Sequence, residues 1–234
     1  CMTTALRKSK RLKDVNPIKN IFDGIKDGIK CTEIEELDVE GISQIYQNSG
    51  TFFHKALEYY GKLPSPERME IVTIFADKLT AAKEIPPNIL LGDKTNKNIL
   101  HYSCLHVRSF LCVYPIFKEN FFELTKLFSQ QDNEKRTPLH NAFRNFDQNT
   151  IQQLLSLLGD EVIQRLLSMK DSSGATPFHL ALSRQSPATI LSLFDYPDEK
   201  LTPLILQQQN DGRSSAHIAG KKQDESVLLR MANI

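Results

Sequence analysis

The strongest constraint in the sequence is a short motif that recurs along the chain at a nearly constant interval. Residues 137–142 read TPLHNA and residues 176–181 read TPFHLA, so their histidines lie 39 residues apart. Looser copies place His101 another 39 residues upstream, His217 38 residues downstream, and His54 47 residues before His101. A fixed period of this size indicates a repeat architecture, in which each repeat packs mainly on its neighbours.

Each copy of the motif predicts the beginning of a helix. The threonine can accept a hydrogen bond from a free N–H of the first turn, and the proline has no N–H to lose and a φ already suited to a helix. We therefore expect a structural role for the motif residues, which are His54, His101, Thr137, Pro138, His140, Thr176, Pro177, His179 and His217.

The Thr-Pro-Leu-His-x-Ala pattern, preceded by a turn such as residues 171–174 (DSSG), resembles the ankyrin repeat. The resemblance covers roughly residues 47–234 and implies an all-α, ankyrin-repeat-like helical solenoid. The ordinary period is about 33 residues, and these repeats are some six residues longer. Residues 159–169 and 196–206 begin with acidic residues and end in apolar ones, which predicts a short third helix in place of the usual β-hairpin.

The predicted domain organisation is a basic tail and helical cap followed by about five repeats. The cap, residues 1–46, would cover the apolar face that a first repeat otherwise exposes. Within it, residues 17–28 predict one helix, and a second short helix is expected from Asp38 through Tyr46. In the second repeat we expect helices over residues 98–113 and 119–129. The repeats are expected at 47–92, 93–131, 132–170, 171–208 and 209–234.

Composition limits the classes of partner and the compartment. The formal net charge is +1, so no global field favours nucleic acid or membrane. The chain has neither an apolar run of about 18 residues nor the apolar stretch of a secretory signal. Four scattered cysteines without CxxC spacing favour a reducing, cytoplasmic compartment. The stretch Arg7–Lys13 fits either a solvated tail or a nuclear-import signal.

The histidines and cysteines that could suggest a metal or catalytic site are better explained by structural roles in the repeats. Histidines of successive repeats should lie on the order of 10 Å apart, too far to share one metal ion. His101, Cys104 and His106 suggest a cysteine–histidine nucleophile pair, but His101 already belongs to the repeat. No phosphate-binding loop, dinucleotide fingerprint or metalloprotease helix is present. We therefore expect no catalytic residue, no metal and no cofactor.

The resemblance to ankyrin repeats implies a binding surface made of the turns and the exposed end of each first helix. Of the twenty positions that this pattern selects, eight are Lys or Arg and two are acidic. The predicted partner-binding residues are Lys94, Lys97, His106, Arg136, Arg144, Arg184, Arg213, Lys221 and Lys222. One hypothesis is a basic concave groove that binds an acidic protein segment, and the alternative is an ordinary solvated face. Nucleic acid is less favoured because interleaved aromatic residues are missing.

Three functions stay open on the sequence. The first is a monomeric, non-catalytic protein-binding module. The irregular repeats and the composition rich in Lys, Asn and Ile favour one kind of such module, an effector that an intracellular bacterium delivers into a host cell to bind a host protein. The second is the ankyrin targeting portion of a larger enzyme whose catalytic domain lies outside this chain. The third is an enzyme with its site in the first 90 residues, where the repeat pattern is weakest.

Overall fold

The structure of the protein is a computed structural model, and it confirms an all-α fold. It describes residues 17–29, 32–45, 50–195, 197–222 and 225–234. In these ranges the chain is mostly helical. The only extended pairing within them consists of isolated β-bridges at Ile45–Thr51 and Gln208–Ser214. The predicted basic tail, Arg7–Lys13, lies outside the described residues. The chain divides into two compact units between Lys94 and Thr95.

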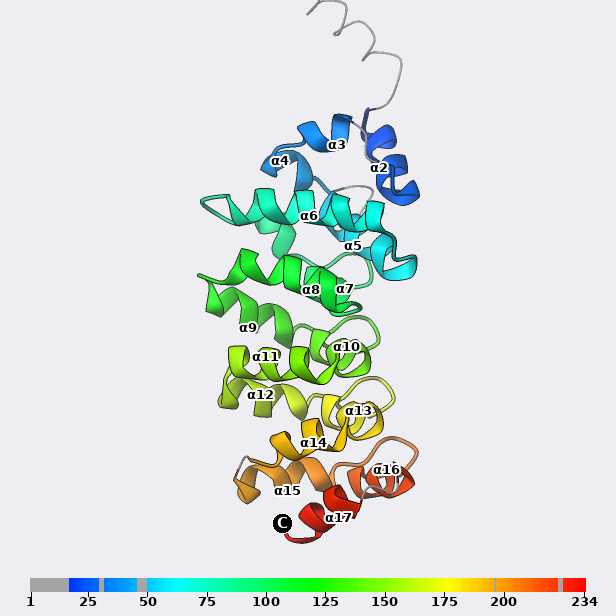
Figure 1. Ribbon diagram of the computed structural model, residues 1–234, viewed down its shortest axis with the longest axis vertical. Helices are drawn as coiled ribbons and strands as arrows, with labels where there is room; N and C mark the ends of the chain where they lie inside the picture. Colours follow the sequence, from blue (N-terminus) through cyan, green and yellow to red (C-terminus); the bar gives the residue numbers. More distant parts are fainter. Residues whose placement is uncertain (1–16, 30–31, 46–49, 196, 223–224) are drawn as a thin grey trace, which may run out of the picture. The chain divides into compact units, whose positions relative to one another are not determined.

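The first unit is a small helical cluster (Figure 1). α5 packs against both α2 and α6, and the rings of Phe53 and Phe75 meet edge to face at 6.3 Å. Its elements are α2 (Pro17–Asp27), α3 (Thr32–Glu36), α4 (Val39–Ile42), α5 (Phe52–Lys62), α6 (Pro66–Thr80) and the 3-10 helix η1 (Pro87–Leu90).

The sequence predicts two helices before the first repeat, and the described residues 17–29 and 32–45 form three. α2 ends where expected, because Gly28 follows it with a φ of +73° that favours glycine. The second expected helix begins one residue after Asp38, which caps α4 with Oδ1 accepting from the N–H of Gly41 at 2.8 Å. That helix is nevertheless shorter than predicted, since it ends at Ile42 and Ile45 pairs with Thr51 in a β-bridge. Tyr46 lies outside the described residues.

The second unit repeats an order of three helices. The motif helices pack successively on one another, α7 on α10, α10 on α13 and α13 on α16 (Figure 1). Each is followed by a second helix, and α8, α11 and α14 are followed by a third. The elements are α7 (Ile99–Ser103), α8 (Val107–Val113), η2 (Tyr114–Phe117), α9 (Phe121–Ser129), α10 (Pro138–Asn145), α11 (Gln148–Leu158), α12 (Asp160–Leu167), α13 (Pro177–Arg184), α14 (Pro187–Leu193), α15 (Asp198–Leu206), α16 (Ser215–Lys222) and α17 (Glu225–Ala232).

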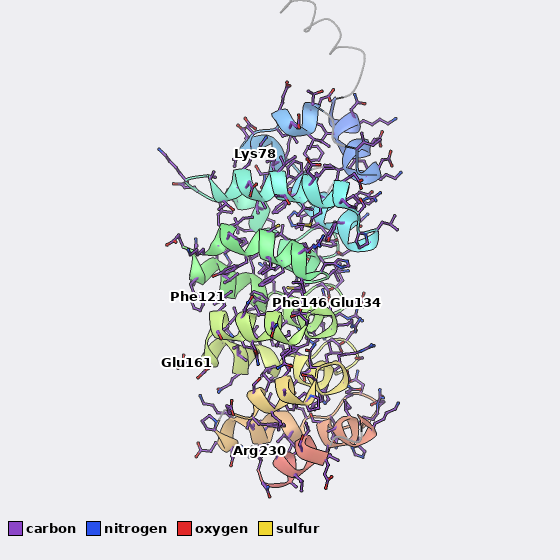
Figure 2. The ribbon with its side chains drawn as sticks, in the orientation of Figure 1. Lys78, Phe121, Glu134, Phe146, Glu161 and Arg230 are labelled. Atoms are coloured by element: carbon purple, nitrogen blue, oxygen red, sulfur yellow. The ribbon has the colours of Figure 1, made fainter. Side chains whose placement is uncertain are left out.

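The third helices account for the long period. α12 and α15 lie where the sequence predicts them, and each begins with two acidic residues that suit the positive end of the helix dipole. The third helix α12 also packs on α9, the third helix of the preceding repeat. In Figure 2, Phe121 at the start of α9 lies on the side of this unit opposite to Glu134, which belongs to a turn.

The prediction of one helix over residues 98–113 is wrong. α7 ends at Ser103 and α8 begins at Val107, and side chains from α8 and α10 donate to carbonyl groups at the break. Ser109 Oγ donates to the carbonyls of Ser103 and His106, both at 2.9 Å, and Asn145 Nδ2 donates to that of Cys104 at 3.3 Å. The helix expected over 119–129 is therefore the third helix of its repeat, α9, and it begins at Phe121.

One turn position before each motif histidine of this unit has a left-handed backbone. It is glycine at Gly174 and Gly212, with φ of 77° and 81°, but it is Asn96 and Lys135 in the other two turns, each with φ of 58°. Asparagine tolerates this conformation better than lysine, and glycine adopts it without steric cost.

We predict that Lys135→Gly stabilises the protein by about 1 kcal/mol, because it removes the cost of a left-handed lysine. The exposed Lys135 side chain packs into no core, and its carbonyl, which accepts from Gln131 Nε2 at 2.7 Å, is kept. The free energy of unfolding in urea measures the effect. Lys135→Ala is the matched control, because it removes the same side chain but keeps the Cβ. An equal gain in both variants would contradict the backbone explanation.

Candidate partner-binding groove

Each motif histidine is held by the residue that caps its own helix. In α13 the N–H of Thr176 donates to His179 Nδ1 at 3.2 Å, and the N–H of His179 donates back to Thr176 Oγ1 at 3.3 Å. The same reciprocal bonds occur between Thr51 and His54 in α5. Because Nδ1 accepts a hydrogen bond from a backbone N–H, the ring proton of the neutral histidine lies on Nε2.

That Nε2–H then donates to a backbone carbonyl that follows the last helix of the repeat. His101 Nε2 lies 2.9 Å from the carbonyl oxygen of Arg136, and His140 Nε2 lies 3.3 Å from that of Ala175. His179 reaches the carbonyl of Gln207 at 3.2 Å. Within the first unit, His54 reaches that of Leu91 at 3.0 Å. Each of these histidines therefore links the cap of its own helix to a more distant part of the backbone.

Burial makes these histidines hard to protonate. Desolvation lowers the pKa of His54 to about 4 and that of His140 to about 4, and it also lowers the pKa of His179. The imidazole is therefore neutral at pH 7, as its role as a hydrogen-bond acceptor at Nδ1 requires.

The turns are shaped by aspartates that the motif analysis missed. Asp132 Oδ1 accepts from the N–H groups of Glu134 and Arg136, both at 2.9 Å. Asp171 Oδ1 accepts from the N–H groups of Ser173 at 2.8 Å and Ala175 at 2.9 Å. Both aspartates are buried and stand eight residues before a motif histidine. Aligning the copies would have revealed this shared position.

Successive turns are also joined to each other by backbone hydrogen bonds. The N–H of Ser172 donates to the carbonyl of Glu134 at 2.9 Å, and the N–H of Asn210 donates to that of Ser173 at 3.0 Å. The turns therefore form a continuous ladder, which fixes the spacing of the side chains that they present.

Several of the predicted binding residues pair with acidic side chains of the protein itself, among them Lys97 and Arg136. Lys97 Nζ lies 4.0 Å from Asp132 Oδ2, and Arg136 Nη1 lies 2.6 Å from a carboxylate oxygen of Glu134. Arg136 Nε is also 3.9 Å from Asp171 Oδ2. These acids offset part of the positive charge that the sequence pattern assigns to this part of the surface.

The remaining predicted residues are scattered, apart from one group of three. Lys94 is exposed in the first unit, and Arg144 is exposed near the end of α10. His106 is half-buried at the start of α8, and the Lys222 side chain lies outside the described residues. The structure brings together Arg184, Arg213 and Lys221, all of them exposed.

These three residues line a groove between α13 and α16, which we call the basic groove. It has a volume of about 470 Å³, and no acidic side chain is among its lining residues. Arg213 is paired with Asp211 through Nε at 2.7 Å. The lining residues are His179, Leu180, Ser183, Arg184, Gln209, Arg213, His217, Ile218 and Lys221.

A second groove of the same unit has a different chemistry. It lies between α8, η2 and α11, measures about 730 Å³, and has no charged lining residue. Its walls are apolar side chains such as Phe110 and Leu157 together with the amides of Gln152 and Gln153. None of the predicted partner-binding residues lines it, so the basic groove is the better match to the predicted site.

The described residues offer no support for the nucleophile hypothesis. Cys104 is fully buried, and burial raises the pKa of its thiol far above the ordinary value, so a reactive thiolate is disfavoured. Both ring nitrogens of His101 are bonded, to Asn98 and to the carbonyl of Arg136. No cluster of three or more His, Cys, Asp or Glu suited to a metal ion occurs among the described residues. Nor is any described helix both long and apolar enough to span a membrane.

Comparison with known proteins identifies no family for the chain. It matches none of the protein-family models against which it was scanned. A search of the curated proteins found no significant match either. Function is therefore inferred from the residues of the basic groove themselves.

Proposed function

We propose that this protein is a non-catalytic protein-interaction module built of elongated ankyrin-like repeats. It would bind an acidic segment of a partner protein in the basic groove between α13 and α16. The capped motif helices, the hydrogen-bonded turns and the regular period support the ankyrin-like arrangement. The observation that carries the functional proposal is the meeting of Arg184, Arg213 and Lys221 in a groove without an acidic lining residue.

The physical basis of binding is electrostatic complementarity on a rigid surface. Arg184 lies at the end of α13 and Lys221 in the last turn of α16, so two regular helices fix the separation of the two cations. Complementary charge speeds encounter and selects partners more than it adds raw affinity. Salt should therefore weaken binding, because the participating side chains are exposed.

We predict that the double variant Arg184→Gln/Lys221→Gln loses about tenfold or more in affinity for a captured partner, since each cation contributes about 1 kcal/mol. The measurement is affinity capture from a cell lysate with wild-type and variant protein, quantified by mass spectrometry. Any partner that is enriched with the wild type is then titrated against both proteins at two salt concentrations.

The matched control is Arg108→Gln/Lys118→Gln, which removes the same charge from exposed positions outside the basic groove. A partner that requires Arg184 and Lys221 but not Arg108 and Lys118 would support the groove. An equal loss of affinity in both double variants would show that binding depends on the net charge of the protein and not on the groove. Unchanged binding in the groove variant would contradict the proposal.

A further inference from the structure

His217 differs from the other motif histidines in the partner of its ring. Its Nδ1 is held like theirs, accepting from the N–H of Ser214 at 3.3 Å and lying 2.7 Å from Ser214 Oγ. In His101, His140 and His179, however, Nε2 donates to a backbone carbonyl farther along the chain. Among the described residues, no such acceptor is found for Nε2 of His217.

The ring of His217 is therefore a hydrogen-bond donor with a fixed orientation. Because Nδ1 accepts from a backbone N–H, the proton of the neutral ring must be on Nε2. The ring is exposed and lines the basic groove. The groove thus contains a donor that the other repeats use internally and that is free here to bind an external oxygen atom.

The charge of the groove is close to +2. Arg184 and Lys221 each contribute one positive charge, and no described residue is ion-paired with either. Arg213 contributes little net charge, because its Nη2 lies 2.7 Å from Asp211 Oδ2. The apolar side chains of Leu180 and Ile218 form part of the wall.

From these features we propose that the basic groove binds a phosphomonoester dianion, namely a phosphorylated side chain of the partner protein. This inference rests on the proposed function and specifies the acidic group. A phosphomonoester has a charge of about −1.5 to −2 at pH 7 and three acceptor oxygens. The charge matches the net charge of the groove, and the oxygens can each face one of its three donor side chains, Arg184, Lys221 and His217.

Other anions match this set less well. A carboxylate has one charge and two oxygens, so it would neutralise only one of the two cations and leave one donor side chain in water. A phosphodiester of nucleic acid also has a single charge per phosphate, and no Phe, Tyr or Trp side chain for base stacking lines the groove. The phosphomonoester is therefore the anion that the groove satisfies most completely.

The test uses three blocked pentapeptides, Gly-Gly-X-Gly-Gly, in which X is phosphoserine, glutamate or serine, together with inorganic phosphate. Binding is followed by NMR through the ring signals of His217, which are assigned with the variant His217→Gln. We expect the phosphoserine peptide to bind at least tenfold more tightly than the glutamate peptide and to shift the His217 signals. Inorganic phosphate should shift the same signals but bind more weakly than the phosphopeptide.

Charge-removing variants locate the effect. Arg184→Gln and Lys221→Gln should each weaken phosphopeptide binding at least fivefold, whereas Arg108→Gln, exposed on α8, should leave it unchanged. A glutamate peptide that binds equally well, or a phosphopeptide that leaves His217 unshifted, would overturn the inference. So would inorganic phosphate that binds as tightly as the peptide, or a single-stranded decanucleotide that binds more tightly.

These outcomes are distinct from the failure of the proposed function. If the phosphopeptide fails but a captured partner still requires Arg184 and Lys221, the groove binds a protein by another acidic group. If neither depends on these residues, the inference and the proposed function fail together.

Discussion

Acidification from pH 7 to pH 5 should destabilise each unit of the protein by about 2 kcal/mol for each buried motif histidine with a pKa near 4. Burial lowers the pKa of His54 in the first unit and of His140 in the second from 6.5 to about 4. Between these values the unfolded chain binds a proton that the folded chain does not. The free energy of unfolding is therefore highest above pH 6.5, where both states are unprotonated, and it decreases as the pH falls toward 4. Burial also lowers the pKa of His179.

The measurement is the free energy of unfolding in urea at several pH values between 5 and 7, a range in which most carboxylates remain ionised. His140→Gln is the informative variant, because an amide can donate to the carbonyl of Ala175 but does not titrate. It should be less stable at pH 7 and have a flatter pH dependence than the wild type. An equally steep dependence in His140→Gln would show that the acid sensitivity comes from other groups.

Local capping signals made much of the fold predictable. Thr137 and Thr176 begin helices because a threonine cap and a first-turn proline depend only on neighbouring residues. The break between α7 and α8 was missed because it depends on Ser109 and on Asn145, which is 41 residues distant from Cys104 in the chain. Contacts of this kind cannot be read from a local pattern.

The candidate site was less predictable than the helices. The repeat pattern selected basic residues at equivalent positions, yet Arg136 pairs with Glu134 and lies near Asp171 of the following turn. Which cations remain available depends on how the turns stack, and stacking is a property of the folded chain. The importance of His217 was also hidden, because its sequence resembles the other copies while its Nε2 has a different environment.

Gly174→Ala should be among the most destabilising small substitutions in the second unit, costing about 3 kcal/mol through backbone strain and a steric clash. A Cβ at Gly174 would lie 2.5 Å from Asn210 Oδ1 and 2.8 Å from the backbone nitrogen of Asn210. That nitrogen donates to the carbonyl of Ser173 at 3.0 Å, so relief of the clash would break the link between successive turns.

Gly212→Ala is the matched control for this prediction. Gly212 has a φ of +81°, close to the +77° of Gly174, but a Cβ there would meet no atom within 4 Å. It should therefore cost only the strain of a left-handed alanine, about 1 kcal/mol. The free energy of unfolding in urea, measured for both variants, separates backbone strain from the steric clash. Equal decreases in the two variants would show that the clash between the turns contributes nothing. In an Asn210→Ala background Gly174→Ala should still cost more than Gly212→Ala, because the clash with the backbone nitrogen remains.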